Sequence, residues 1–217
     1  MEVFSRIISL LLILVLSPFI FIIVIFSYIF QGFPIFFKQK RIGYKYQIFE
    51  IYKFRTMQQN SGSSITVLKD NRITKFGRIL RKTKIDEIPQ LFNILKGDMR
   101  FIGPRPEVQA YFNKNSFKFL EKIKPGISDF SSIIFRNEDI ILDSISGQKP
   151  YNKLLPIKLE LAYYYAKKKT FLLDLKLTLI TIISIGFPEF CSKKIIIPQI
   201  SKDLPSVKVF LKKYVHS

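Results

Sequence analysis

The run IISLLLILVLSPFIFIIVIFSYIFQGFPIFF, residues 7–37, carries no charged side chain over 31 consecutive positions. A helix needs about 20 apolar residues to cross a bilayer, so this run is long enough to enter a membrane. A secretory signal peptide has a shorter apolar core and a small-residue cleavage site, and neither is visible here. We therefore expect residues 1–37 to form a retained membrane anchor.

Ser17 and Pro18 lie close to the centre of this run. Proline removes one helical hydrogen bond and clashes with the preceding turn, so it kinks or breaks a helix. The residues alone leave two alternatives open: a kinked single-pass helix, or a re-entrant hairpin that enters and leaves through one leaflet. Cations flank both ends of the run, Arg6 before it and Lys38 after it, and this bias gives mild support to the hairpin.

The composition of the whole chain limits the function. Its 217 residues have a net charge of +19, which favours an anionic partner: nucleic acid, acidic lipid or a phosphorylated substrate. The single cysteine, Cys191, excludes an intramolecular disulfide. The single histidine, His216, is the penultimate residue, so the sequence excludes catalytic sites built on several histidines and His-rich zinc sites.

The sequence after the anchor predicts an α+β fold that is mainly helical. We expect a compact interfacial domain over 38–190, with a small β-hairpin within 37–57, and a peripheral tail over 191–217. Helical patterns and turn signals give the remaining elements. They are a polar loop at 58–68, a basic helical face at 72–81, helices at 84–96 and 156–169, and a buried or interfacial helix at 171–187.

The stretch KIDEIPQ, residues 84–90, places Asp86 and Glu87 side by side after a strongly basic segment. Pro89 lacks a backbone donor, which a helix tolerates only in its first turn, so the helix should begin near Ile85. Successive helical residues point about 100° apart. The two carboxylates can therefore face different targets, such as a phosphorus atom and a metal ion. Cations precede the pair at positions Lys69, Arg72, Lys75, Arg78, Arg81, Lys82 and Lys84.

The groups available for chemistry are carboxylates, arginines and lysines beside a membrane. No phosphate-binding glycine loop, CxxC pair or zinc-spaced set is present in the sequence. Two prolines in GPRP, residues 103–106, hold Arg105 in a rigid turn, where a guanidinium suits phosphate. Carboxylates also hold Mg²⁺ and attack phosphorus. These features predict phosphoryl chemistry at the membrane surface.

Three stretches resemble the bacterial sugar transferases, the monotopic phosphoglycosyl transferases that initiate surface-glycan assembly. They are FKQKRIGYKYQIFEIYKFRTM (37–57), RITKFGRILRKTKIDEIPQLFNILKGDMRFIGPRP (72–106) and FLLDLKL (171–177). The resemblance extends over about residues 1–185. It implies transfer of a sugar-1-phosphate from a UDP-sugar to undecaprenyl phosphate with Mg²⁺, through a covalent phosphosugar–Asp intermediate. It also implies a location on the cytoplasmic face of the bacterial inner membrane, in contact with phospholipid and downstream glycosyltransferases but not nucleic acid.

The same resemblance implies roles for individual residues. Asp86 would be the nucleophile and Glu87 the Mg²⁺ ligand. Ser17 and Pro18 would form the helix break of a re-entrant anchor. The residues implied in substrate binding are Arg81, Arg105, Lys53 and Arg55 of KFRTM, and Arg136 with Asn137.

Two departures from the family pattern lie in the C-terminal half. The chain reads GISDFSSIIFRN (126–137) where the family commonly has a G-[LIV]-T-G-x-[AL]-Q type of stretch, and Ala162 stands where members tend to have Asp. Two other readings therefore stay open: a member that lost activity through Ala162, and a non-enzymatic polybasic protein that binds acidic lipid or a partner. A nucleic-acid binder is a weaker alternative, because no known binding module is visible.

Overall fold

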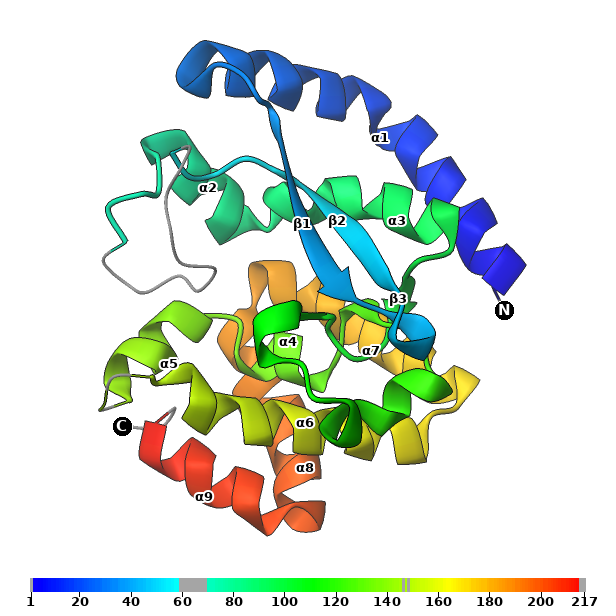
Figure 1. Ribbon diagram of the computed structural model, residues 1–217, viewed down its shortest axis with the longest axis vertical. Coiled ribbons are helices and arrows are strands. Elements are labelled where there is room, and N and C mark those ends of the chain that lie inside the picture. The colour runs from blue at the N-terminus through cyan, green and yellow to red at the C-terminus, as the bar shows by residue number, and fades with distance from the viewer. Residues whose placement is uncertain (1, 59–69, 146, 148, 215–217) are drawn as a thin grey trace.

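A computed structural model describes residues 2–58, 70–145, 147 and 149–214 (Figure 1). The chain is mostly helical with two small sheets, which confirms the expected balance of helix and strand. The α-helices are α1 (Glu2–Gln31), α2 (Lys75–Thr83), α3 (Leu91–Lys96), α4 (Phe130–Ile134), α5 (Glu138–Ser144), α6 (Tyr151–Lys168), α7 (Phe171–Gly186), α8 (Ile197–Asp203) and α9 (Pro205–Tyr214). The strands are β1 (Phe36–Ile42), β2 (Ile48–Phe54), β3 (Arg100–Ile102), β4 (Glu107–Val108) and β5 (Gly126–Ser128). Short 3₁₀ segments are η1 (Tyr44–Tyr46), η2 (Ile85–Gln90), η3 (Gln109–Tyr111) and η4 (Lys114–Glu121), and η5 (Phe190–Ile196) is π-helical.

Helix α1 runs along one side of the molecule and is continuous through Pro18 (Figure 1). The predicted break between two helices is therefore absent from the described structure. A proline at position 18 cannot donate to the carbonyl of Leu14, four residues earlier. The hydroxyl of Ser17 donates to that carbonyl instead, at 2.7 Å, so the helix continues without an unpaired acceptor there. By length and composition α1 is able to cross a membrane.

The predicted hairpin is confirmed. Strands β1 and β2 pair antiparallel from Phe36 opposite Phe54 to Ile42 opposite Ile48, and β4 adds to the other edge of β1. A second sheet pairs β3 with β5 in parallel. The outer edge of β2 is covered by a side chain of α3: the fully buried Asn93 accepts from the Tyr52 N–H at 3.1 Å and donates to the Glu50 carbonyl at 2.6 Å. Asn93 thus fixes α3 to β2.

The acidic pair lies in a helical segment that begins and ends where the sequence predicts. The segment opens at Ile85 as η2, and α3 continues it to Lys96. Gly97 ends α3 with a φ of +88°, a left-handed conformation that glycine adopts easily. The predicted polar loop at 58–68 lies, apart from Gln58, outside the described residues.

The largest hydrophobic core lies between helices α4 to α9. The segment after Cys191, expected at the periphery, contributes buried side chains to this core, among them Ile196, Ile200 and Val207. Helix α7 packs Leu177 and Ile180 inward and exposes apolar side chains such as Leu172 and Ile182 on its other side. Helix α6 begins at Tyr151, five residues before the predicted start at 156. These contacts join the C-terminal segment to the rest of the domain.

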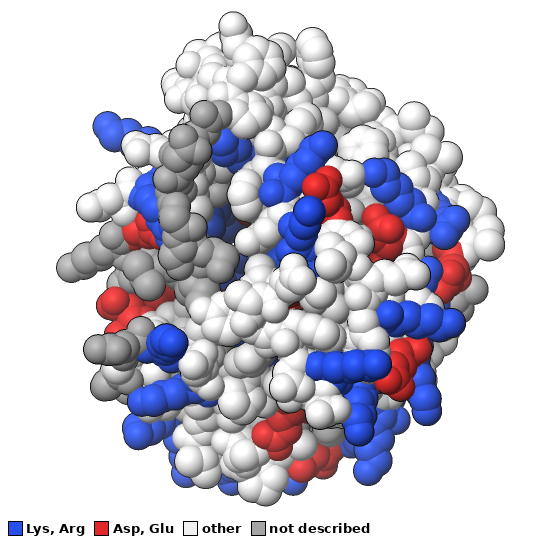
Figure 2. Space-filling view, viewed as in Figure 1, with Lys and Arg blue, Asp and Glu red and all other residues white. Residues whose placement is uncertain are grey.

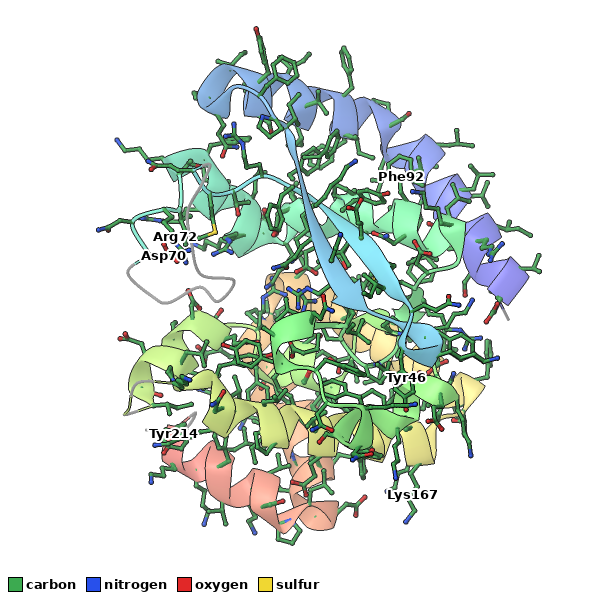
Figure 3. The ribbon with its side chains drawn as sticks, viewed as in Figure 1. Tyr46, Asp70, Arg72, Phe92, Lys167 and Tyr214 are labelled. Carbon is green, nitrogen blue, oxygen red and sulfur yellow. The ribbon has the colours of Figure 1, made fainter. Side chains whose placement is uncertain are left out.

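Charge is distributed unevenly over the surface. On the face shown in Figure 2, the part over α1 is almost free of charged side chains, whereas Lys and Arg gather over the rest of the molecule. Figure 3 shows Asp70 and Arg72 side by side before α2, where they form an ion pair of 2.5 Å. The uncharged α1 surface agrees with a membrane-facing helix.

Candidate active site

The two carboxylates lie in the first turn of η2, directly after the junction with α2. Asp86 is 6% exposed, and the Glu87 side chain is 12% exposed. Pro89 is buried in the same short helix, and Ile85 and Ile88 pack against neighbouring apolar clusters. The helix is therefore anchored by its apolar residues, and this holds both carboxylates at fixed positions in a largely dehydrated environment.

Glu87 is neutralised by two cations from distant parts of the chain. Lys53 Nζ from β2 lies 2.8 Å from Glu87 Oε1, and Arg105 Nη2, from the turn after β3, lies 2.6 Å from the same oxygen. A second Arg105 nitrogen donates to Glu87 Oε2 at 3.3 Å. Burial alone would raise the pKa of Glu87, but the charges of Arg105 and Lys53 outweigh it and hold the pKa well below its ordinary value. Glu87 is thus a stable carboxylate.

Asp86 has a different environment although it is the next residue. Its Oδ1 atom is buried and has no hydrogen-bond partner among the described residues. Burial raises the pKa of Asp86; the attraction of Lys53 opposes this effect and the negative charge of Glu87 adds to it. One carboxylate of the pair is therefore saturated by cations, while the other has an oxygen available for a ligand or for attack.

Two further cations approach the pair from the end of α2. Arg81 donates through Nε to the hydroxyl of Thr56 at 3.1 Å, and its charge acts on Asp86. Lys84 is half-buried between α2 and η2, and its ammonium interacts electrostatically with both carboxylates. Burial lowers the pKa of Lys84, and the negative charge of Glu87 opposes this shift. The pair thus lies within a group of at least four cations.

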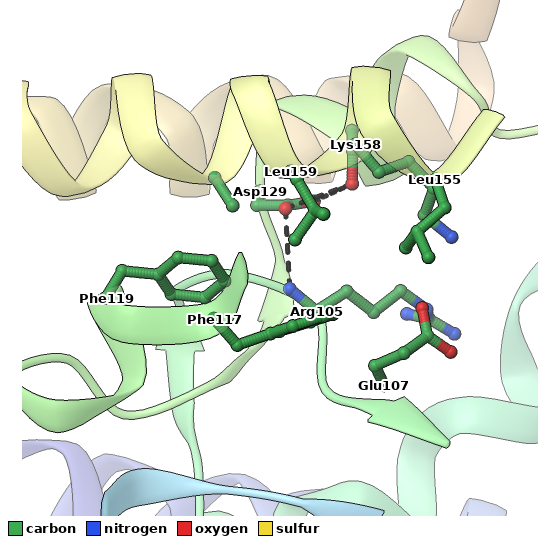
Figure 4. A pocket seen from close by; sticks show the side chains of 10 residues that line it. Arg105, Glu107, Phe117, Phe119, Asp129, Leu155, Lys158 and Leu159 are labelled. Carbon is green, nitrogen blue, oxygen red and sulfur yellow. Dashed lines mark hydrogen bonds between the residues drawn. The ribbon is translucent and has the colours of Figure 1, made fainter. Parts of the chain in front are cut away.

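Arg105 is fixed by its own surroundings as well as by Glu87. Its guanidinium donates to the carbonyl of Ile127 at 3.2 Å, and its backbone N–H donates to Asp129 at 3.4 Å (Figure 4). Asp129 and Ala162 both line a small pocket beside Arg105 with a volume of about 20 Å³, enough for about one water molecule. The pocket is therefore lined by two carboxylates, Asp129 and Glu107, although position 162 is alanine.

The structure brings together four of the predicted site residues, namely Asp86, Glu87, Lys53 and Arg105, and places Arg81 next to them.

The other predicted residues lie elsewhere or at the margin. Arg55 donates to the carbonyls of Gln31 and Gly32, so it binds the end of α1. Arg136 is half-buried and close enough to Glu87 for their charges to interact, whereas Asn137 is exposed at the start of α5. Substrate binding by these three residues stays a prediction.

Sequence reasoning missed Lys84 and Asp129 as site residues. Lys84 adjoins the acidic pair in the sequence, so the basic run itself was the available signal, but it contains seven cations and does not single out one. Asp129 accepts a hydrogen bond from Arg105, which lies 24 residues earlier in the chain. The available signal was the stretch GISDF, which contains Asp129 and departs from the family pattern. Only the fold shows which of these residues face the pair.

The carboxylates of the site suit a Mg²⁺ ion whose ligands come partly from the protein and partly from a substrate. Within the described residues, no group of three or more His, Cys, Asp or Glu side chains could hold a metal alone. Mg²⁺ is commonly held by one or two carboxylates together with substrate phosphates. Glu87, the predicted ligand, would supply such a carboxylate, and the adjacent Asp86 has a buried Oδ1 with no partner among the described residues.

Comparison with known proteins gives consistent matches. A family model described as bacterial sugar transferase matches residues 1–187. The uncharacterized sugar transferase EpsL of Bacillus subtilis (strain 168) is 40% identical over 154 residues, which cover 70% of this chain and 69% of the relative.

Two further relatives have names that state an activity. UDP-N-acetylgalactosamine-undecaprenyl-phosphate N-acetylgalactosaminephosphotransferase of Aeromonas hydrophila is 35% identical over 157 residues, or 69% of this chain. UDP-glucose:undecaprenyl-phosphate glucose-1-phosphate transferase of Klebsiella pneumoniae is 30% identical over 185 residues, or 81% of this chain. The matched regions make up only 34% and 38% of these two longer relatives.

Proposed function

The chain belongs to the bacterial sugar transferase family, and we propose that it transfers a sugar-1-phosphate from a UDP-sugar to undecaprenyl phosphate. The product would initiate the assembly of a surface polysaccharide or glycoconjugate. The names of the Aeromonas and Klebsiella relatives support both the lipid acceptor and a UDP-sugar donor. The observation that carries the proposal is the buried, unpartnered Oδ1 of Asp86 beside a Glu87 whose charge is already neutralised.

In the proposed reaction Asp86 is the nucleophile. One of its carboxylate oxygens attacks the β-phosphorus of the donor, the bond from this phosphorus to the bridging oxygen breaks, and UMP leaves with the electron pair. An oxygen of undecaprenyl phosphate then attacks the same phosphorus and restores the Asp86 carboxylate. Burial makes Asp86 a less solvated and more basic carboxylate than an exposed aspartate, as its raised pKa indicates, which favours attack.

The surrounding cations supply charge complementarity for the donor diphosphate. Lys53 and Arg105 neutralise Glu87 in the free protein, and anionic phosphate oxygens are alternative partners for both cations. Arg81, whose charge acts on Asp86, would hold phosphate as well. Glu87 would hold Mg²⁺ together with the donor phosphates, and the bound ion would offset the negative charge of the diphosphate.

We also propose that both ends of α1 face the cytoplasm, as in the predicted re-entrant anchor, although the helix is continuous through Pro18 and would lie within one leaflet without a break between two helices. Both ends of α1 contact the same domain, which supports this topology. Near the start of α1, Glu2 pairs with Lys124 at 3.1 Å, and at its end the Gln31 side chain accepts from Thr74 at 2.8 Å.

Labelling of cysteines introduced at Ser5→Cys and Lys38→Cys tests the topology in sealed vesicles with a membrane-impermeant reagent. The native Cys191 is fully buried and should contribute little background. We expect both positions to react from the same side; reaction from opposite sides would establish a membrane-spanning α1.

The activity is tested with the purified full-length chain, undecaprenyl phosphate and Mg²⁺. UDP-glucose, UDP-galactose and UDP-N-acetylgalactosamine are offered in turn, and UMP release and lipid-linked sugar phosphate are measured. We expect turnover of at least one donor and its loss when EDTA removes the metal. If all three donors are inert while the protein still binds acidic vesicles, the non-enzymatic polybasic reading is favoured.

A further inference from the structure

Lys84 has a backbone conformation that is costly for a residue with a Cβ atom. Its φ is +60° and its ψ is 13°, in the left-handed region. The other described non-glycine residues with positive φ, Lys45 and Tyr46, form the tight turn between β1 and β2. Lys84 instead lies two residues before Asp86. Backbone strain of this kind persists where the surroundings enforce it, and it is concentrated at functional sites.

The Lys84 ammonium also differs from the neighbouring cations in its contacts. Lys53 and Arg105 are paired with Glu87, and the Arg81 Nε atom bonds Thr56. The Lys84 ammonium forms no hydrogen bond or ion pair with a described residue, although it is half-buried.

An ammonium in this position has lost part of its water without gaining an anionic partner. The two carboxylates are close enough to act on its charge, but neither contacts it. Such a group is complementary to an anion that arrives from outside, and a lysine is a suitable point charge for a phosphate oxygen.

We propose that Lys84 binds a phosphate oxygen of the donor diphosphate. This inference rests on the proposed function, because it assigns a ligand to the same site. It gives the strained junction between α2 and η2 a role, because the junction holds the Lys84 ammonium against the reacting diphosphate.

The test uses substitutions that the left-handed backbone tolerates. Glycine and asparagine both adopt positive φ readily, so Lys84→Gly and Lys84→Asn remove the charge without adding strain. Lys84→Arg keeps a cation. Lys82→Asn, at an exposed position of α2, is the matched control for loss of one positive charge.

Two measurements are made on the full-length chain. Calorimetry measures the binding of UDP in the presence of Mg²⁺, and thermal unfolding gives the midpoint temperature of the protein. We expect Lys84→Asn and Lys84→Gly to weaken UDP binding about tenfold or more, as loss of one charged hydrogen bond predicts. The thermal midpoint should be unchanged or higher, because glycine relieves the strained backbone. Lys84→Arg should recover most of the affinity, and Lys82→Asn should match the wild type.

The inference is overturned if Lys84→Asn binds UDP within twofold of the wild type, or if it binds weakly only because its thermal midpoint has fallen. Failure of the proposed function gives a different result. In that case the wild type turns over none of the UDP-sugars, whereas UDP binding and its dependence on Lys84 are still measured directly.

Discussion

Replacement of Asn93 by alanine should destabilise the protein and disturb the active site at the same time. The Asn93 side chain pairs the outer edge of β2 through Tyr52 N–H and the Glu50 carbonyl, and it is fully buried. The residue after Tyr52 is Lys53, whose ammonium pairs with Glu87. Loss of Asn93 therefore removes one of the contacts that hold β2, and with it Lys53, beside the acidic pair.

The size of the effect follows from the two backbone groups that lose their partner. Each buried group left without a hydrogen bond costs about 1–3 kcal/mol. Glu50 is exposed, so water can reach its carbonyl, and we expect a total loss of about 3 kcal/mol in the free energy of unfolding. For a chain of this size, 1 kcal/mol corresponds to about 2–4 °C in the thermal midpoint, which predicts a fall of about 6–12 °C.

The assay is thermal unfolding of the full-length protein in detergent, followed by circular dichroism, with sugar transfer measured in parallel. Asn115→Ala removes an exposed asparagine and serves as the control, with an expected change near zero. We expect transfer by Asn93→Ala to fall even well below its thermal midpoint. A midpoint within 2 °C of the wild type would refute the reasoning, because it would mean that the β2 edge is satisfied without Asn93.

Three other predictions concern the same region. Gly77→Ala would place a Cβ atom 2.1 Å from the Thr56 carbonyl oxygen, so it should cost about 2 kcal/mol or more, read as a lower thermal midpoint. Because the folded pKa of Glu87 lies below its ordinary value of 4.5, its stabilising effect is present above that pH and is lost as the pH falls towards the folded pKa. Glu87→Gln should accordingly show a smaller loss of thermal midpoint between pH 6 and 4 than the wild type; an identical slope would contradict the ion-pair assignment. Asp86 affects stability in the opposite direction, because its folded pKa is raised. Stability is lost as the pH rises through this folded pKa and the buried group ionises. Asp86→Asn should therefore raise the thermal midpoint at pH 7 while it abolishes transfer, and a lower midpoint would show that the Asp86 carboxylate is stabilising.

Signals from neighbouring residues predicted the elements whose formation depends on short-range interactions along the chain. The β-branched and aromatic residues of 46–54 predicted the β1–β2 hairpin, Pro89 predicted where η2 begins, and Gly97 predicted where α3 ends. The continuity of α1 was not predicted, because it depends on the Ser17 hydroxyl replacing the donor that Pro18 lacks.

Features that depend on distant contacts could not be read from the sequence. Residues 195–211 look like a basic tail, and only packing against α4 and α6 shows that their apolar positions enter the core. The pairing of Glu87 with Arg105 joins residues 18 apart, and its pairing with Lys53 joins residues 34 apart. The sequence identified Glu87, Arg105 and Lys53 as candidate site residues. Only the fold shows that the two cations both contact the Glu87 carboxylate.

The central claim is that Asp86 becomes covalently bonded to the phosphosugar. Intact-mass analysis of the wild type, incubated with a UDP-sugar and Mg²⁺ but no lipid acceptor, measures this directly. We predict a mass increase of one phosphosugar on the wild type and none on Asp86→Asn. An equal mass increase on Asp86→Asn, or an unchanged transfer rate in that variant, would contradict the account.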